Sequence, residues 1–138
     1  MPEARKAVKF GLTLPNRGVL LGATTTGQLL ELSERAEAGG QFDSLWVGDS
    51  LLAKPRLESI TLLSAVAART RKLKMGPACL ASFPLRDPLW LAYQWASLDV
   101  LSEGRTVMVA CMGGGSREAG GDFLKEFEAV GLDVRGRA

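Results

Sequence analysis

Four short segments of the sequence hold the side chains and glycines that could take part in chemistry. Each directly follows a predicted strand, and together they comprise residues 14–16, 49–50, 78–82 and 111–115. Ligands of parallel α/β proteins bind at the carboxyl ends of the strands, so a site is expected here. Asp49 follows a buried strand, where its carboxylate either holds a polar ligand or caps the next turn.

The last of these segments contains a cysteine and three glycines. Cys111 is a candidate reactive thiol, although a cysteine in this position is more often a small buried apolar residue. The glycines at 113–115 would let the backbone approach a flat ligand or a phosphate closely. They do not match the dinucleotide-binding fingerprint, because Glu118 stands at its sixth position, and no Gly-Lys-Ser/Thr of a P-loop follows.

The composition narrows the classes of chemistry available to the chain. Its 138 residues predict one domain, and 46% hydrophobic residues are enough for a core. The sequence has no histidine, which excludes a Ser-His-Asp triad, a Cys-His dyad and an HExxH zinc helix. A net charge of only +2 argues against a dedicated partner among nucleic acids or anionic membranes.

The cysteines and the apolar runs predict a protein of a reducing compartment. Cys79 and Cys111 are far apart and form no C-x-x-C pattern, so neither a disulfide nor a metal site is expected. No apolar run reaches the roughly 18 residues of a membrane span, and the charged first residues do not resemble a signal peptide. We therefore expect a cytoplasmic protein.

Strand and helix patterns alternate along the chain. Thr25 and Gln28 form a capping-box pattern, and Asp87-Pro88 is a typical helix start. Alternation of this kind predicts a parallel sheet with helical crossovers and the strand order 1-2-3-4. The predicted strands are 8–14, 44–47, 73–80 and 106–111, and the predicted helices are 25–40, 57–71, 87–104 and 123–130.

The motifs at the strand ends resemble, as a set, the bacterial-luciferase-like monooxygenase family. They are KFGL (9–12), FDSLWVGDS (42–50), PRLE (55–58), PLRDP (84–88), LDVLSEGR (98–105) and FEAVG (127–131). The family fold is a (β/α)8 barrel, which typically takes about 250 residues. The resemblance therefore implies the N-terminal half of such a barrel, with about four parallel strands. We expect residues 1–138 to form one partial domain, truncated at its C-terminus.

The resemblance also implies a flavin site at the carboxyl ends of the strands. A non-proline cis peptide beneath the flavin ring is expected at Ala78–Cys79. The family's catalytic positions correspond to Asp49, Ser50 and Cys111, where Ser50 replaces the histidine of many relatives and Cys111 matches the reactive thiol of luciferases. The implied cofactor contacts are Leu14, Asp49, Ala78, Cys79, Met112 and Gly113.

By this resemblance the chain is a luciferase-like oxidoreductase. It would use reduced FMN or 8-hydroxy-5-deazaflavin for monooxygenation or hydride transfer on a small organic substrate, with dioxygen as a further reactant. Asp49 and the segment 55–58 favour the deazaflavin. Two alternatives stay open, namely a non-catalytic flavin-binding α/β fragment and an unrelated small nucleotide-binding protein, and the failed glycine fingerprints count against the latter.

A partial barrel is expected to associate with a second copy of itself. Its edge strands would leave backbone donors and acceptors unpaired. Its inner face would expose the apolar side chains of Leu12, Leu45 or Trp46, Met75 and Met108. A homo-oligomer would cover both defects.

Overall fold

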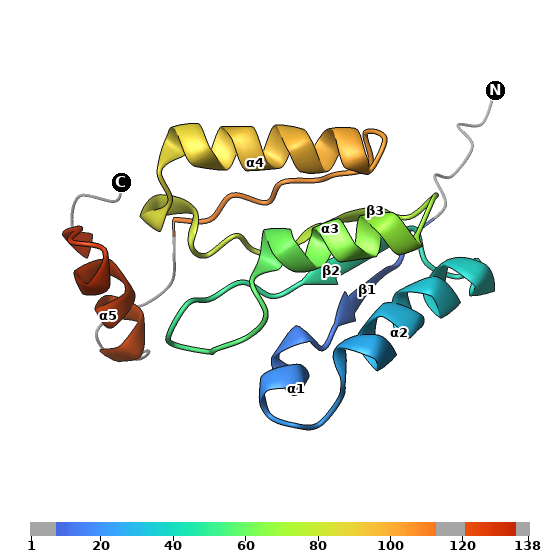
Figure 1. The fold of residues 1–138 in the computed structure, drawn as a ribbon, viewed down its shortest axis with the longest axis horizontal. Coiled ribbons are helices and arrows are strands. Elements are labelled where there is room, and N and C mark those ends of the chain that lie inside the picture. The colour runs from blue at the N-terminus through green and yellow to red at the C-terminus, as the bar shows by residue number, and fades with distance from the viewer. Residues whose placement is uncertain (1–7, 113–120, 135–138) are drawn as a thin grey trace.

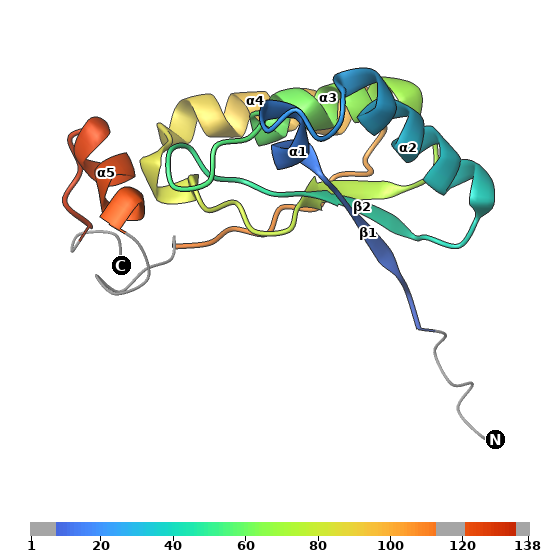
Figure 2. The same ribbon diagram turned by 90° about the horizontal axis from the view of Figure 1, so that it is seen from below.

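Parallel strands form one layer of the structure, and helices cover one of its faces (Figures 1 and 2). The computed structural model describes residues 8–112 and 121–134. None of the described helices has the length and apolar composition needed to cross a lipid bilayer. In chain order the elements are β1 (Gly11–Leu14), α1 (Asn16–Leu20), α2 (Thr26–Gly39), β2 (Ser44–Val47), α3 (Ser59–Arg69), β3 (Lys74–Pro77), the 3-10 helix η1 (Phe83–Leu85), α4 (Pro88–Leu101) and α5 (Gly121–Ala129).

The sheet has the order β1-β2-β3 and all of its strands run parallel. The predicted fourth strand lies beside β3, as the order 1-2-3-4 requires, but it forms only isolated bridges. Met75 bonds the backbone on both sides of Thr106, with N···O distances of 2.9 and 2.8 Å. The ladder then stops because Pro77 has no N–H to donate. The structure therefore has three strands rather than four, with residues 106–110 as an irregular neighbour.

Local signals set the helix boundaries. The Gln28 N–H donates to Thr25 Oγ1 and the Thr25 N–H donates to Gln28 Oε1, so the predicted capping box at the start of α2 is confirmed. Gly40 ends this helix at a φ of 65°, a left-handed conformation that glycine adopts without strain. Asp87 caps α4 by accepting from the Trp90 N–H at 2.9 Å, directly before Pro88.

The core lies between the sheet and the helices that cover it. Leu45 and Met75 are adjacent in the register, both fully buried, and Leu12 packs against the same core. The prediction that Leu12 and Met75 point into the barrel interior is therefore wrong, and so is Leu45 as one of the two alternatives given with them. Strand side chains alternate between faces, and the opposite face carries Trp46, which is partly exposed and donates to Ser44 Oγ at 2.9 Å. Of the two alternatives at positions 45 and 46, Trp46 is therefore the side chain on the open face.

Candidate functional site

The loops that follow β1 and β2 are joined by one buried amide side chain. Asn16 is 2% exposed, and its Nδ2 donates to the carbonyl oxygens of Gly48 at 2.9 Å and Leu57 at 3.2 Å. Its Oδ1 accepts from the Gly48 N–H at 3.2 Å. These bonds fix both ends of the loop between β2 and α3, which we call the β2–α3 loop (residues 48–57). This loop contains two of the predicted catalytic residues.

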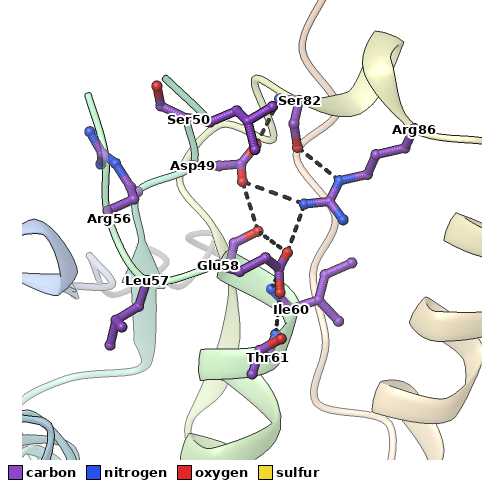
Figure 3. Close-up of polar contacts among 12 residues, drawn as sticks. Asp49, Ser50, Arg56, Leu57, Glu58, Ile60, Thr61, Ser82 and Arg86 are labelled. Carbon is purple, nitrogen blue, oxygen red and sulfur yellow. Dashed lines mark hydrogen bonds and ion pairs between the residues drawn. The ribbon is translucent and has the colours of Figure 1, made fainter. Parts of the chain in front are cut away.

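Asp49 lies at the centre of a polar cluster that links three segments (Figure 3). Its Oδ1 accepts from the Ser59 hydroxyl at 2.9 Å, and its Oδ2 accepts from the Ser82 N–H at 2.7 Å. The side chain is only 5% exposed. Asp49 thus joins the end of β2 to the start of α3 and to the segment after β3, and both of its oxygens already have donors.

The guanidinium of Arg86 lies between two carboxylates. Its Nη2 is 2.7 Å from Glu58 Oε1 and 3.7 Å from Asp49 Oδ1, and its Nε donates to Ser82 Oγ at 2.8 Å (Figure 3). The Arg86 side chain is 19% exposed, so this cluster is only partly accessible to water. Charge-assisted bonds of this kind are roughly twice as strong as neutral ones. We call Asp49, Glu58, Ser82 and Arg86 the carboxylate–arginine cluster.

Glu58 also begins helix α3. Its carboxylate accepts from the backbone N–H groups of Ile60 at 3.1 Å and Thr61 at 2.6 Å. Burial by itself would raise the pKa of Glu58, but the bonds from Thr61, Arg86 and Ile60 outweigh it and hold the pKa below its ordinary value. Glu58 is therefore an ionised cap that ties the helix start to the cluster.

Two further polar side chains of the β2–α3 loop face different surroundings. The Ser50 hydroxyl donates to Glu126 Oε1 at 3.0 Å and accepts from the Lys54 N–H at 3.0 Å. The Arg56 guanidinium lies against Gly48, where an added Cβ would come within 2.9 Å of Arg56 Cζ. Burial, followed by repulsion from Arg17, lowers the pKa of Arg56, although Asp49 and Glu126 attract it. Figure 3 shows Arg56 pointing away from the carboxylate–arginine cluster.

The predicted cofactor contacts lie at different depths. Leu14 is 1% exposed and belongs to the core. Ala78 is exposed just after β3, and Met112 is 47% exposed at the end of the irregular fourth segment. Gly113 lies outside the described residues. The exposed Ala78 side chain, at the carboxyl end of a strand, leaves this position open to a ligand.

Two predictions at this edge are wrong, namely the cis peptide at Ala78–Cys79 and the absence of a disulfide. The peptide between Ala78 and Cys79 is trans, the form that a non-proline bond prefers by about 3 to 4 kcal/mol. Cys79 and Cys111 form a disulfide, with Cα atoms 5.8 Å apart, so Cys111 is not a free thiol here. Their partnership arises because Leu80 and Ala110 pair across the gap. Cysteine spacing did not reveal this pairing, because it depends on which backbone segments lie side by side.

Several residues of this region were not singled out from the sequence. Glu58 and Arg86 stand in two of the family-like motifs, but a motif match assigns no role to a particular side chain. Asn16 belongs to a strand-end segment and was weighed only as part of it. Glu126 precedes another motif and had no signal of its own, because its partners lie more than 70 residues away.

Fold and site together define an α/β protein of consecutive β-α units with a polar cluster at the carboxyl ends of its strands. The family model described as luciferase-like monooxygenase matches residues 8–130. The chain belongs to this family, whose members are oxidoreductases, monooxygenases among them. Membership confirms the resemblance found in the sequence motifs.

Two curated relatives are similar to part of the chain. The chain is 41% identical over 83 residues to N-acetyl-S-(2-succino)cysteine monooxygenase of Bacillus subtilis, covering 54% of this chain and 18% of that protein. It is 34% identical over 97 residues to an F420-dependent glucose-6-phosphate dehydrogenase of Amycolatopsis mediterranei, covering 66% and 27%. The chain thus spans less than a third of the length of either relative.

Solved structures show the same fold. Monooxygenase RslO1 from Streptomyces bottropensis superposes with a TM-score of 0.69 at 25% identity, over 94% of this chain and 39% of that one. The oxygenating constituent of 3,6-diketocamphane monooxygenase from Pseudomonas putida, in complex with FMN, superposes with a TM-score of 0.66 at 17% identity, over 95% and 36%. The fold predicted from the sequence, part of a luciferase-like barrel, is therefore confirmed.

Proposed function

We propose that the chain contributes the first β-α units of a flavin- or deazaflavin-dependent oxidoreductase that acts on a small organic substrate. One observation carries the proposal. The carboxylate–arginine cluster holds the segments after β2 and β3 together beside Ala78, at the edge of the sheet where family members act. The cofactor is reduced FMN or 8-hydroxy-5-deazaflavin, and the printed names of the similar proteins include both FMN and F420.

The bound cofactor supplies the redox chemistry, which is either activation of dioxygen or hydride transfer. The protein's part is to bind, orient and exclude water. Ala78, Cys79 and Met112 would hold the cofactor, with the buried Leu14 in the core behind them, and Gly113 is a further contact that only the family resemblance implies. Arg56 and Arg17 place positive charge at the same edge, where they would attract the cofactor's phosphate.

The proposed catalytic residues are Asp49, Ser50 and Cys111. Asp49 fixes the loop geometry and places its carboxylate 3.7 Å from Arg86 Nη2. The Ser50 hydroxyl is oriented by Glu126 and by the Lys54 N–H. Cys111 would offer a thiol only when its bond to Cys79 is reduced.

A non-catalytic cofactor-binding fragment is the second candidate, and a specific observation favours it. Both carboxylate oxygens of Asp49 have donors, and the Ser50 hydroxyl both donates and accepts a hydrogen bond. These hydrogen bonds engage both groups within the fold, as a structural role requires. Turnover with a reduced cofactor distinguishes the two candidates.

Titration of the chain with FMN and with the deazaflavin, followed by absorbance and fluorescence, tests the proposal. We expect saturable binding of one of them and its loss in Ala78→Arg, because the long charged side chain would occupy the ring position. Ala38→Arg is the matched control, since Ala38 is exposed at the end of α2, away from the site. Absence of binding by the wild-type chain, or equal loss in both variants, would contradict the proposal.

Self-association remains part of the proposal, on a different surface from the one expected. Helix α4 exposes large apolar side chains, among them Leu89 at 77%, Trp90 at 64% and Val100 at 78%. Apolar surface of this extent favours association. Analytical ultracentrifugation over a dilution series is expected to show a species larger than the monomer, whereas a monomer at all concentrations would contradict this part.

A further inference from the structure

One carboxylate oxygen of helix α5 accepts four hydrogen bonds from the β2–α3 loop. Glu126 Oε1 receives the backbone N–H groups of Leu51 at 3.0 Å, Leu52 at 2.6 Å and Ala53 at 2.8 Å, together with the Ser50 hydroxyl at 3.0 Å. Successive N–H groups turned to one side form a nest, which binds anions. We call residues 50–53 the loop nest.

The loop nest has little else to hold it. Leu51 is 50% exposed and Leu52 is 46% exposed, so their apolar side chains do not anchor the loop in the core. The ends of the loop are fixed independently, by Asn16 and by the contacts of Asp49. Contacts of the intervening backbone with the rest of the fold therefore run through Glu126.

The burial of the Glu126 carboxylate is unfavourable by itself. Its side chain is fully buried beside Phe127, which is 2% exposed, and its Oε2 has no hydrogen-bond partner among the described residues. Burying a carboxylate is unfavourable unless donors compensate it. Because the four donors all meet at Oε1, the loop nest is what makes this buried position tolerable.

We propose that the loop nest is an oxyanion-binding site whose built-in ligand is Glu126, and that Glu126 is a positioning residue for the β2–α3 loop. By accepting hydrogen bonds from residues 50–53, Glu126 orients the Ser50 hydroxyl and keeps Arg56 over Gly48. The nest stands on its geometry alone. Only the positioning of Ser50 and Arg56 for cofactor binding rests on the proposed function.

Residue-specific amide hydrogen exchange by NMR on the whole chain tests the nest directly. In Glu126→Ala, we expect the amides of residues 51–53 to exchange about tenfold faster or more, while those of α3 stay unchanged. Glu126→Gln keeps a neutral acceptor, and we expect it to fall between the wild type and Glu126→Ala, because charged acceptors bind more strongly. Glu128→Ala is the matched control, since Glu128 is exposed on the same helix.

Unchanged exchange at residues 51–53 in Glu126→Ala would overturn the nest. So would a uniform rise of exchange throughout α3 and the sheet in both Glu126 variants, because Glu126 would then support the whole fold. Cofactor titration of the same samples separates the two proposals. A nest confirmed by exchange in a wild-type chain that binds neither FMN nor the deazaflavin contradicts the proposed function alone.

For the positioning role, we expect cofactor affinity to fall about tenfold in Glu126→Ala, to recover partly in Glu126→Gln and to stay unchanged in Glu128→Ala. Glu37→Ala is a second control, because Glu37 also accepts successive backbone N–H groups but lies away from the site. Equal affinity in the wild type and Glu126→Ala would overturn the positioning role.

Discussion

At each end of the sheet, one glutamate accepts hydrogen bonds from successive backbone N–H groups. At the carboxyl ends of the strands, Glu126 accepts three successive N–H groups of the β2–α3 loop and is fully buried. At the amino ends, Glu37 of α2 accepts the N–H groups of Arg71, Lys72 and Leu73, and it is partly exposed. In barrel folds the first end carries function and the second supports stability.

The arginines of the two ends differ in the same sense. Arg105, at the amino ends, donates chiefly to backbone carbonyls, including Leu73 O at 3.0 Å and Ser102 O at 2.6 Å. Arg86, at the carboxyl ends, donates to the side chains of Ser82 and Glu58 and to no backbone carbonyl among the described residues. Arg105 thus ties backbone segments together, whereas Arg86 ties side chains together.

The largest expected loss of stability comes from removing a disulfide that only the carboxyl end has among the described residues. The Cys79–Cys111 disulfide closes a loop of 32 residues at the carboxyl end. Cys79→Ser with Cys111→Ser, or reduction, is expected to lower the free energy of unfolding by about 3 to 4 kcal/mol, because the unfolded chain regains loop entropy. Urea denaturation with and without reductant measures it, and equal midpoints for the two would show that the bond contributes nothing.

Removing each arginine tests whether one end carries stability and the other carries binding. Arg105→Met is expected to cost about 2 to 3 kcal/mol, because buried carbonyl oxygens lose their donors, while cofactor affinity stays unchanged. Arg86→Met is expected to cost about 1 to 2 kcal/mol and to weaken cofactor binding. Urea denaturation and cofactor titration are compared for both variants. A loss of cofactor affinity in Arg105→Met with unchanged affinity in Arg86→Met would contradict this division between the two ends.

The hydrogen bonds of Glu37 with residues 71–73 are expected to contribute less to stability. Glu37→Ala removes the acceptor of three N–H groups, of which those of the exposed Arg71 and Lys72 can bond water instead, so a loss of about 1 kcal/mol in unfolding free energy is expected. Glu31→Ala, on the exposed surface of the same helix, serves as the control. Thermal denaturation of both variants measures the loss of stability in Glu37→Ala relative to the control. A loss as large as that of Arg105→Met would contradict this prediction.

Acid is expected to have the smallest effect, and it acts at both ends. Burial by itself would raise the pKa of Glu37, but the N–H groups of Lys72, Arg71 and Leu73 hold it below the ordinary value of 4.5, and the pKa of Glu58 is also lowered. A lowered folded-state pKa stabilises the fold above the unfolded-state pKa, and this stability is lost as pH falls through the folded-state value. Urea denaturation at several pH values should therefore show unfolding free energy falling below about pH 4.5, with a smaller decline in Glu37→Gln.

Local signals made much of the fold predictable. The capping box of Thr25 and Gln28, the Asp87-Pro88 start and the alternation of elements predicted α2, α3, α4, α5 and the parallel order correctly, but not the short helices α1 and η1. Alternation alone did not say which face of each strand the helices cover, so Leu12 and Met75 were assigned to the wrong side. Pro77 is visible in the sequence, but its effect depends on the register between β3 and residues 106–110.

The site was less predictable because its contacts join distant parts of the chain. Asp49 was identified from its place after a strand, but Arg86 lies 37 positions further on, and only the fold brings them together. Glu126 and the disulfide pose the same difficulty, since neither helix periodicity nor cysteine spacing encodes which segments become neighbours. The order of the family-like motifs substituted for this information and identified the family.

The hydrogen bonds of the Asn16 side chain have a consequence for the rate of unfolding. Its side chain bonds partners 32 and 41 positions away, so these bonds can form only after β2 has paired with β1 and the β2–α3 loop has closed. Interactions completed late in folding are largely absent from the transition state, and they act mainly on the unfolding rate. We therefore expect Asn16 to affect the unfolding rate, and with it the lifetime of the folded chain, more than the folding rate.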